Sequence, residues 1–410
     1  MVHVIEEANR CLQCKKPMCM TGCPISTEIP HMIKLFKEGK VKDAGQMLFE
    51  NNPLSIVCSL VCDHNKQCEG HCVLARKGQG IHISSIENYI SNAVLDTLEI
   101  PLQPKNGNMV AVIGAGPAGI TIAIEMARKG YDVTIFDSKD KIGGVLQYGI
   151  PEFRLPKSIL ERYKKKLISI GIKIRPNTTI GGALVIDDLF RDGYKAIFIG
   201  TGVWRPKKLA VKGESLGNVS FAIDFLANPS AYNLGEDIAI IGAGNTAMDV
   251  ARTILRSGHH NVTIYARRNR IEASDEERDY AALDGANFEY CMKVDHITPD
   301  GPVFKKNILD DDGNIIGESE EFYPVHADNT FIAISQGPKS KLVDTTEGLK
   351  PSKNGLLLTN DKGETTHPGI FAAGDVVLGA KTVVEAVSYA KKVAESMDEY
   401  IKGLGSESSN

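Results

Sequence analysis

Eight of the nine cysteines of this 410-residue chain lie within its first 72 residues, and this crowding is the strongest constraint on its fold. They are Cys11, Cys14, Cys19, Cys23, Cys58, Cys62, Cys68 and Cys72. The first residues, MVHVIEEANR, have neither the basic start nor the apolar stretch of a secretory signal, so we expect a cytoplasmic location. In a reducing compartment, crowded cysteines favour a metal or an iron–sulfur cluster over disulfides.

The spacing of these cysteines favours iron–sulfur clusters over zinc. The first run reads C-x2-C-x4-C-x3-C-P and the second reads C-x3-C-x5-C-x3-C. Zinc sites usually combine two short CxxC hooks, and neither run supplies two of them. Three closely spaced cysteines followed by one before a proline form a ferredoxin-type pattern, in which the fourth cysteine binds the other cluster. We therefore predict two [4Fe–4S] clusters, with structural zinc as the alternative.

The charge and hydropathy of the chain argue against two classes of partner. The formal net charge is −4 and the pI is near 6.2, so there is no bias toward nucleic acid. The longest apolar runs have the length of a strand, far below the roughly 20 residues that cross a bilayer. We expect neither nucleic-acid nor membrane binding.

Three regions differ in composition along the chain. Residues 1–100 are rich in cysteine and show helical periodicity over 29–52 and 83–98. Residues 100–108 carry two prolines and a glycine and are interpreted as a linker. Two strand–turn–helix–strand units follow, near 109 and 237. We predict an α/β fold with two doubly wound nucleotide-binding domains, preceded by an α-helical iron–sulfur domain.

The first of these units carries a dinucleotide-binding pattern. Gly114, Gly116 and Gly119 form GxGxxG between an expected strand and an expected helix. Glycine permits the tight turn, the approach of a pyrophosphate and close helix–strand packing. The phosphates then lie at the helix N-terminus, where unpaired N–H groups favour anions. Asp137 ends the next expected strand, where it can accept hydrogen bonds from a ribose.

The second unit keeps the glycine turn, with alanine at the third small position. Its second strand ends without an acid, and two arginines follow. Guanidinium groups in place of a carboxylate suit a ribose 2′-phosphate, which favours NADPH over NADH, whereas the alternative is a solvated turn. We assign NADPH binding to Gly242, Gly244, Asn245, Thr246, Ala247, Arg267 and Arg268.

A short apolar strand near the C-terminus ends in a Gly-Asp pair and is followed by a helical pattern. A carboxylate at a strand tip commonly binds the ribityl and phosphate end of a flavin, although it can also be a buried structural group. The FAD domain is then split by an inserted NADPH domain, and the strands in 196–202 and 329–337 lead out of and back across the insertion. We assign FAD binding to Gly114, Gly116, Pro117, Ala118, Gly119, Asp137, Gly144, Gly374, Asp375, Thr382 and Val383.

These assignments set the expected domain boundaries. They are 1–100 for the helical domain, 109–228 and 351–402 for the two parts of the FAD domain, 229–350 for the NADPH domain and 403–410 for a disordered tail.

The combined motifs resemble the family of the small subunit of bacterial glutamate synthase. This family also includes the flavin-cluster half of dihydropyrimidine dehydrogenase and the large subunit of electron-bifurcating NADH-dependent ferredoxin:NADP oxidoreductase. The similarity covers about residues 6–400. One departure is RIEASDEERD (270–279), because members often carry a Met-Pro pair a few residues after the double arginine.

The resemblance implies a crossed set of cluster ligands. The first cluster would be held by Cys11, Cys14, Cys19 and Cys72, and the second by Cys23, Cys62, Cys68 and a Gln or Glu on the following helix. Glu87 stands at the matching place in SSIENYI, which implies that it ligates. The alternatives are that Glu87 faces solvent or that Cys58 completes the second cluster. Cys291 is isolated and is expected to be a small buried hydrophobe.

The resemblance implies an electron-input subunit that oxidises NADPH through FAD and passes single electrons through the clusters. The second unit has no CxxC, which disfavours a thioredoxin-reductase type of dithiol. No residues remain for a substrate domain, so the terminal reaction belongs to a partner subunit or a ferredoxin-like acceptor, and we expect a hetero-oligomer. No catalytic side chain is assigned. The alternatives are a subunit of a dihydropyrimidine dehydrogenase-type complex, the large subunit of a bifurcating oxidoreductase, and a non-catalytic scaffold.

Overall fold

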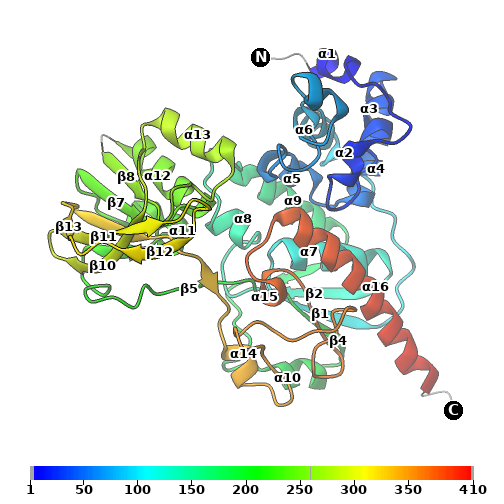
Figure 1. Ribbon diagram of the computed structural model, residues 1–410. Coiled ribbons are helices and arrows are strands. Elements are labelled where there is room, and N and C mark those ends of the chain that lie inside the picture. Colours follow the sequence, from blue (N-terminus) through cyan, green and yellow to red (C-terminus); the bar gives the residue numbers. More distant parts are fainter. Residues whose placement is uncertain (1–3, 259, 408–410) are drawn as a thin grey trace. The chain divides into compact units, whose positions relative to one another are not determined.

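The computed structural model describes residues 4–258 and 260–407, with the side chains of 406 and 407 left aside. The chain divides into two compact units, each with its own sheet (Figure 1). Unit 1 comprises Met1–Gln147, Glu152–Val203 and Pro338–Asn410, and unit 2 comprises Tyr148–Pro151 and Trp204–Gly337.

The N-terminal region of unit 1 is helical, as predicted. Its apolar residues recur at helical spacing and form one core, in which Met32, Ile33, Leu48 and Ile90 are fully buried. Gly39 ends the first long helix with a positive φ of 75°, so the periodic stretch 29–52 forms two helices. The elements are α1 (Val4–Asn9), α2 (Met18–Thr21), α3 (Ile29–Lys37), α4 (Val41–Asn51), α5 (Ser55–Val61), η1 (Val73–Lys77) and α6 (Ile83–Val94).

The rest of unit 1 is a doubly wound α/β layer. Its sheet has the order β16-β4-β1-β2-β3 and all its pairs are parallel. The long last helix, α16, packs against α7 (Figure 1), and the Tyr131 hydroxyl donates to Asp398 at 2.7 Å. The elements are β1 (Met109–Ile113), α7 (Pro117–Arg128), β2 (Asp132–Phe136), α8 (Val145–Tyr148), α9 (Lys157–Ser169), β3 (Lys173–Arg175), α10 (Ile186–Arg191), β4 (Tyr194–Ile199), α14 (Lys341–Asp344), β16 (Ile370–Ala372), α15 (Asp375–Leu378) and α16 (Val383–Glu407).

Unit 2 holds a second parallel sheet, of order β6-β14-β7-β8-β9, and an antiparallel sheet formed by β10, β11, β12 and β13. A two-stranded ribbon, β5 with β15, stands where the chain enters and leaves the unit. The elements are β5 (Arg205–Pro206), β6 (Val219–Phe221), α11 (Ala222–Ala227), η2 (Pro229–Ala231), β7 (Asp237–Ile241), α12 (Asn245–Ser257), β8 (Asn261–Tyr265), α13 (Asp275–Asp284), β9 (Asn287–Glu289), β10 (Met292–Thr298), β11 (Gly301–Leu309), β12 (Ile315–Glu318), β13 (Tyr323–Pro324), β14 (Asn329–Ile332) and β15 (Gln336–Gly337).

These sheets confirm the predicted α/β fold with two doubly wound domains, but unit 2 begins and ends earlier than we expected. Its main segment starts at Trp204 rather than at 229, because β6 pairs with β14 and therefore belongs to the second sheet. It ends at Gly337 rather than at 350. The strand expected to lead back across the insertion is β14, a member of the inserted sheet itself, and only the short β15 closes the unit.

The predicted disordered tail is wrong for residues 403–407. Helix α16 continues through them to Glu407, while 408–410 lie outside the described residues. The side chain of Ile401 is 4% exposed, and a helix that is already formed and packed adds residues at little cost.

Among the described residues, none of the helices combines the length and the apolar character needed to cross a membrane.

Candidate iron–sulfur and dinucleotide sites

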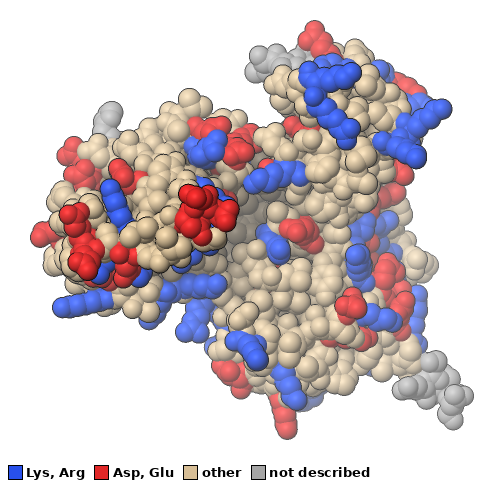
Figure 2. Space-filling model, viewed as in Figure 1, with Lys and Arg blue, Asp and Glu red and all other residues tan. Residues whose placement is uncertain are grey.

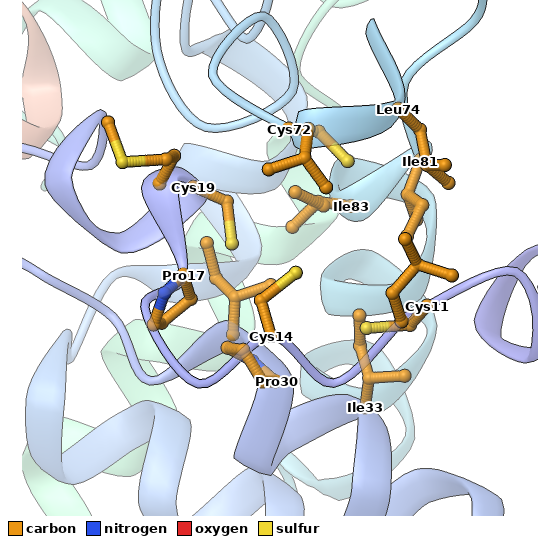
Figure 3. A pocket seen from close by; sticks show the side chains of 14 residues that line it. Cys11, Cys14, Pro17, Cys19, Pro30, Ile33, Cys72, Leu74, Ile81 and Ile83 are labelled. Carbon is orange, nitrogen blue, oxygen red and sulfur yellow. The ribbon is translucent and has the colours of Figure 1, made fainter. Parts of the chain in front are cut away.

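Four cysteines from three segments converge on one pocket in the helical region. Cys11 and Cys14 lie on the loop between α1 and α2, Cys19 lies in α2, and Cys72 directly precedes η1. All four line the same pocket, and Figure 3 shows their sulfur atoms pointing toward a shared space. These are the four residues that the resemblance groups as ligands of the first cluster.

The surroundings of this first cysteine group are apolar. Residues such as Ile29, Ile33, Ile81 and Ile83 line the pocket together with the cysteines. Burial, followed by the charges of neighbouring Cys72 and Cys11, raises the pKa of the Cys19 thiol to about 11. Thiolates crowded in an apolar pocket repel one another unless a cation lies between them. The group therefore fits a positively charged iron centre.

A second cysteine group, formed by Cys23, Cys62 and Cys68, lies in the same helical region. Cys23 follows α2, Cys62 follows α5 as its C-cap, and Cys68 lies in the turn beyond it. The pKa of the Cys68 thiol is raised by burial first and then by the charges of Glu87, Glu69 and Cys23. Cys23, Cys62 and Cys68 are three of the proposed ligands of the second cluster, and Glu87 is the proposed fourth.

Glu87 is half-buried and lies beside this second group. It lies on α6, and burial raises the pKa of its carboxyl to about 8, with a smaller contribution from Glu69. Its charge also raises the pKa values of both Cys62 and Cys68, which places the carboxyl near their sulfurs. A solvated helical glutamate would show none of these effects.

Cys58 lies beside the same group. It is 3% exposed in α5, and its hydrogen bond is the largest cause of the raised pKa of Cys62. The structure thus brings both candidates for the fourth ligand to the second group, Glu87 near two cysteines and Cys58 next to one.

The glycine turn of unit 1 has the geometry expected of a dinucleotide cradle. Gly114 has a φ of +101°, and a Cβ there would lie 2.5 Å from the carbonyl oxygen of Gly200. A Cβ on Gly119 would lie 1.9 Å from the carbonyl oxygen of Gly114. A Cβ on Gly116, in contrast, would meet only the Gly200 carbonyl oxygen, at 4.0 Å, whereas a Cβ on Gly144 would lie 2.9 Å from the Gly116 Cα. Gly114 and Gly119 therefore permit the close packing of strand, turn and helix, and Gly116 leaves the N-terminus of α7 accessible.

Asp137 belongs to this turn in the structure. Its Oδ2 accepts from the Ala115 N–H at 2.6 Å and its Oδ1 accepts from the Lys139 N–H at 2.8 Å. Burial raises the pKa of the carboxyl, and these two donors lower it. Each carboxylate oxygen can accept a second bond, so Asp137 can brace the turn and still bind a ribose hydroxyl.

The C-terminal part of unit 1 completes this site. Strand β16 leads to Gly374, which has a φ of +78° and whose Cβ would lie 3.1 Å from the Ala118 Cβ on α7. Asp375 therefore lies near the glycine turn, and burial raises its pKa to about 6. Thr382 caps α16, where its hydroxyl donates to Glu385 at 2.6 Å and accepts from the Glu385 N–H at 3.3 Å. Sequence reasoning assigned Thr382 to FAD but missed this capping role.

The glycine turn of unit 2 is open where a phosphate would bind. Gly242 has a φ of +124°, and its Cβ would lie 2.4 Å from the Ala333 carbonyl oxygen. A Cβ on Gly244 would meet no atom within 4 Å, and Ala247 is fully buried in α12. Asn245 and Thr246 begin the helix beside this turn.

The segment that departs from the family pattern folds over this turn. The N–H groups of Glu272 and Ala273 both donate to the Ala243 carbonyl at 2.9 Å. The Ser274 N–H donates to the Asn245 side chain at 2.9 Å. The backbone thus fixes the segment without a Met-Pro pair.

The two arginines follow β8 at the end of the second sheet. Arg267 is exposed and Arg268 is half-buried. The Arg268 Nε is buried and has no hydrogen-bond partner among residues 4–258 and 260–407. Such a group is costly unless a ligand satisfies it, which suits an anion at this position. Cys291, predicted to be buried, is half-buried at the start of β10.

Sequence reasoning missed the side chains that join the helical region to the α/β layer of unit 1. The Tyr163 hydroxyl donates to the Pro53 carbonyl at 2.7 Å. Lys391 Nζ donates to the carbonyls of Glu50 and Asn51 at 2.8 and 2.7 Å. Tyrosine and lysine occur on most helices, so no local signal could have identified them.

The surface around the first cysteine group is basic with an apolar centre. Segments 11–27 and 70–83 carry four Lys or Arg residues and no Asp or Glu. All four are exposed, and Figure 2 shows Lys and Arg side chains gathered over this region. Leu12 and Met18, which line the pocket, are 62% and 39% exposed. The four cations, Lys15, Lys16, Arg76 and Lys77, have no ion pair within the described part of the chain.

Two family profiles match adjacent parts of this chain. One, described as pyridine nucleotide-disulphide oxidoreductase, matches residues 108–392. The other, described as dihydropyrimidine dehydrogenase domain II with a 4Fe-4S cluster, matches residues 2–98.

Several curated proteins are similar along almost their whole length. The glutamate synthase [NADPH] small chain of Azospirillum brasilense is 33% identical over 432 aligned positions, covering 97% of this chain and 89% of that protein. The NAD-dependent dihydropyrimidine dehydrogenase subunit PreT of Salmonella typhimurium is 32% identical, covering 97% and 94%.

Solved structures share the fold at lower identity. FprA of Mycobacterium tuberculosis in complex with NADPH has a TM-score of 0.62 at 16% identity, covering 75% of this chain and 86% of that one. Thioredoxin reductase of Lactococcus lactis has a TM-score of 0.58 at 21% identity, covering 72% and 99%.

Proposed function

The chain belongs to the pyridine nucleotide-disulphide oxidoreductase family, and on that basis we propose that it is the NADPH-oxidising, electron-input subunit of a larger complex. The single observation that carries the proposal is the convergence of Cys11, Cys14, Cys19 and Cys72 on one apolar pocket beside a flavin-type fold. A flavoprotein that transferred only electron pairs would have no use for such a group.

The glycine turns of the two units would hold the two nucleotides. In unit 1, the turn, Asp137 and the N-terminus of α7 would hold FAD, and Asp375 and the start of α16 would hold its ribityl and phosphate end. In unit 2, the open turn at Gly244 would hold the pyrophosphate of NADPH, and Arg267 and Arg268 would bind the 2′-phosphate.

The residues of the helical region would hold two [4Fe–4S] clusters. The first would take Cys11, Cys14, Cys19 and Cys72, and the second would take Cys23, Cys62, Cys68 and Glu87. When bound, the flavin accepts electrons in pairs and releases them singly, and the clusters carry one electron each. The protein supplies an apolar setting for the sulfurs and fixes the helical region on the α/β layer through Tyr163 and Lys391.

The partner would dock at the basic surface around the first cysteine group. Exposed Leu12 and Met18 can be covered by an apolar patch, and Lys15, Lys16, Arg76 and Lys77 suit an acidic rim. The part of the chain that the structure describes holds no separate substrate domain, which agrees with a terminal reaction on another polypeptide.

Two related functions remain as alternatives. The similarity to PreT supports the electron-transfer subunit of a dihydropyrimidine dehydrogenase-type complex. The arginines after β8 favour NADPH, as named for the glutamate synthase small chain, over the NAD named for PreT.

Visible absorption of the anaerobically purified protein tests the proposal. We expect flavin bands over a broad iron–sulfur shoulder, and bleaching of both on addition of NADPH. A colourless protein would support a non-catalytic scaffold instead. Identification of the largest protein that co-purifies then separates the glutamate synthase and dihydropyrimidine dehydrogenase branches.

A further inference from the structure

Thr27 lies between a proposed cluster ligand and the end of a helix. Its side chain is 5% exposed. Its hydroxyl oxygen is 3.5 Å from the Cys23 sulfur and 3.0 Å from the amide nitrogen of Asn51. A buried hydroxyl with two such neighbours has little freedom to rotate.

The roles of these hydrogen bonds follow from the chemistry of the groups. The Asn51 amide N–H2 can only donate, so the Thr27 oxygen accepts from it. A thiol at Cys23 donates to that oxygen, but a thiolate that binds iron has no proton to give. The Thr27 O–H must then donate to the Cys23 sulfur if the contact is kept.

Asn51 is itself held from the α/β layer. It is the last residue of α4, and its carbonyl is one of the helix-end groups that have no partner within the helix. Lys391 of α16 donates to this carbonyl at 2.7 Å and to that of Glu50 at 2.8 Å. Helix α16, which carries Lys391, begins at Val383 and packs against α7. A continuous set of contacts therefore leads from the proposed flavin site to Cys23.

We propose that the Thr27 hydroxyl, oriented by Asn51, donates a hydrogen bond to the Cys23 thiolate of the second cluster and raises the reduction potential of that cluster. The inference rests on the proposed function, because it assumes that Cys23 holds a cluster. Reduction adds one negative charge to the cluster and its sulfurs, so a donor to sulfur stabilises the reduced form more than the oxidised form. An electron from the flavin is then accepted more readily by this cluster.

The effect is expected to be specific to the second cluster. Within residues 4–258 and 260–407, no hydroxyl side chain is hydrogen-bonded to a proposed ligand of the first cluster. The Cys11 sulfur accepts from the Gln13 amide instead, at 3.4 Å. Thr21 offers a matched comparison, because its hydroxyl donates to the Met18 carbonyl at 2.8 Å rather than to a cysteine.

The test compares Thr27→Val, Thr27→Ser and Thr21→Val in the complete, cluster-loaded protein. Dithionite and mediators set the potential while electron paramagnetic resonance measures each reduced cluster. The second cluster is identified as the one whose signal changes in Glu87→Gln. We expect Thr27→Val to lower the reduced-to-oxidised ratio of this cluster about tenfold at a fixed potential, which is about 59 mV for one electron. Thr27→Ser and Thr21→Val should stay within about twofold of the wild type.

A second readout does not depend on the potential. In D2O, pulsed resonance on the wild type should detect exchangeable deuterons coupled to the reduced second cluster, including backbone N–D groups such as that of Glu69 at Cys68. Thr27→Val should lose one of these couplings and keep the others. If the second cluster does not assemble in Thr27→Val, Asn51→Leu provides a further test. It keeps the Thr27 hydroxyl but removes the amide that orients it, so we expect a smaller decrease in the reduction potential of the second cluster.

Three results would overturn the proposal. They are an unchanged potential in Thr27→Val, a set of deuteron couplings that is the same in that variant as in the wild type, and a wild-type protein that lacks the second cluster. Because dithionite reduces the clusters without NADPH, a failure of NADPH to reduce the protein would contradict the proposed function and leave this test intact.

Discussion

The hydroxyl of Tyr163 donates a 2.7 Å hydrogen bond to the carbonyl of Pro53. Tyr163 lies on α9 of the α/β layer, whereas Pro53 lies in the loop before α5, the helix that carries Cys58 and leads to Cys62. The bond is buried, and burial raises the pKa of the Tyr163 hydroxyl, so it remains a donor across the physiological range. One side chain thus fixes the second cysteine group on the layer with the proposed flavin site.

Replacing Tyr163 by Phe removes the donor and leaves the Pro53 carbonyl buried without a partner. The expected loss in the free energy of unfolding is about 1–3 kcal/mol, measured by denaturant unfolding of the loaded protein. Tyr89→Phe is the matched control, because Tyr89 is 52% exposed and should change stability by less than about 0.5 kcal/mol. Equal stability of the two variants would show that the Tyr163 bond does not hold this contact.

Replacing Glu87 by Ala should remove one ligand of the second cluster and leave the first intact. Iron analysis should fall from about eight atoms per chain to about seven or four, depending on whether a three-iron form survives. Cys58→Ala should keep about eight, because Cys58 is not assigned as a ligand. The reverse outcome, with iron lost only in Cys58→Ala, would make Cys58 the fourth ligand.

Replacing both Arg267 and Arg268 by Ala should change cofactor preference. Each hydrogen bond from a guanidinium to a phosphate contributes about 1.5–3 kcal/mol, so kcat/KM for NADPH should fall at least about tenfold while that for NADH changes little. Lys208→Ala serves as the control, since Lys208 is an exposed cation of the same unit with no ion pair in the described residues. An equal loss with both cofactors would contradict a 2′-phosphate site.

Asp375 should make the flavin-free protein less stable as pH rises. Burial raises its pKa to about 6 from 3.8, so the folded state favours the protonated carboxyl. Its contribution to the free energy of unfolding is therefore complete below pH 4 and is lost as the pH rises through 6. The total is about 3 kcal/mol, and about half of it is lost between pH 5 and 7.5. Asp375→Asn should remove this dependence in urea unfolding and should weaken FAD binding. If the stability of Asp375→Asn depends on pH in the same way as that of the wild type, this prediction is wrong.

Local physics explains why much of the fold could be predicted. The turns at Gly114 and Gly242 need a positive φ and a close carbonyl, and only glycine supplies both, so the sequence pattern and the geometry coincide. The two cysteine groups follow from spacing in the same way, because the short intervals within each run keep most of their sulfurs on one loop or helix end.

Long-range pairing explains most of what could not be predicted. Strand β6 joins the second sheet only because it pairs with β14, more than a hundred positions later, and nothing in Val219–Phe221 indicates that partner. The same holds for the bond between Tyr163 and Pro53 and for Lys391 at the end of α4. The helix beyond 403 was missed because its composition favours disorder, whereas packing of the preceding turns extends the helix.

The central claim is that electrons enter this protein in pairs and leave one at a time. An anaerobic NADPH titration, with spin counting by electron paramagnetic resonance and analysis of iron, zinc and acid-labile sulfide, tests it most directly. We predict iron and sulfide in equal amounts, and cluster spins that appear while the flavin absorption falls. Stoichiometric zinc without sulfide, or flavin bleaching with no cluster spin, would contradict it.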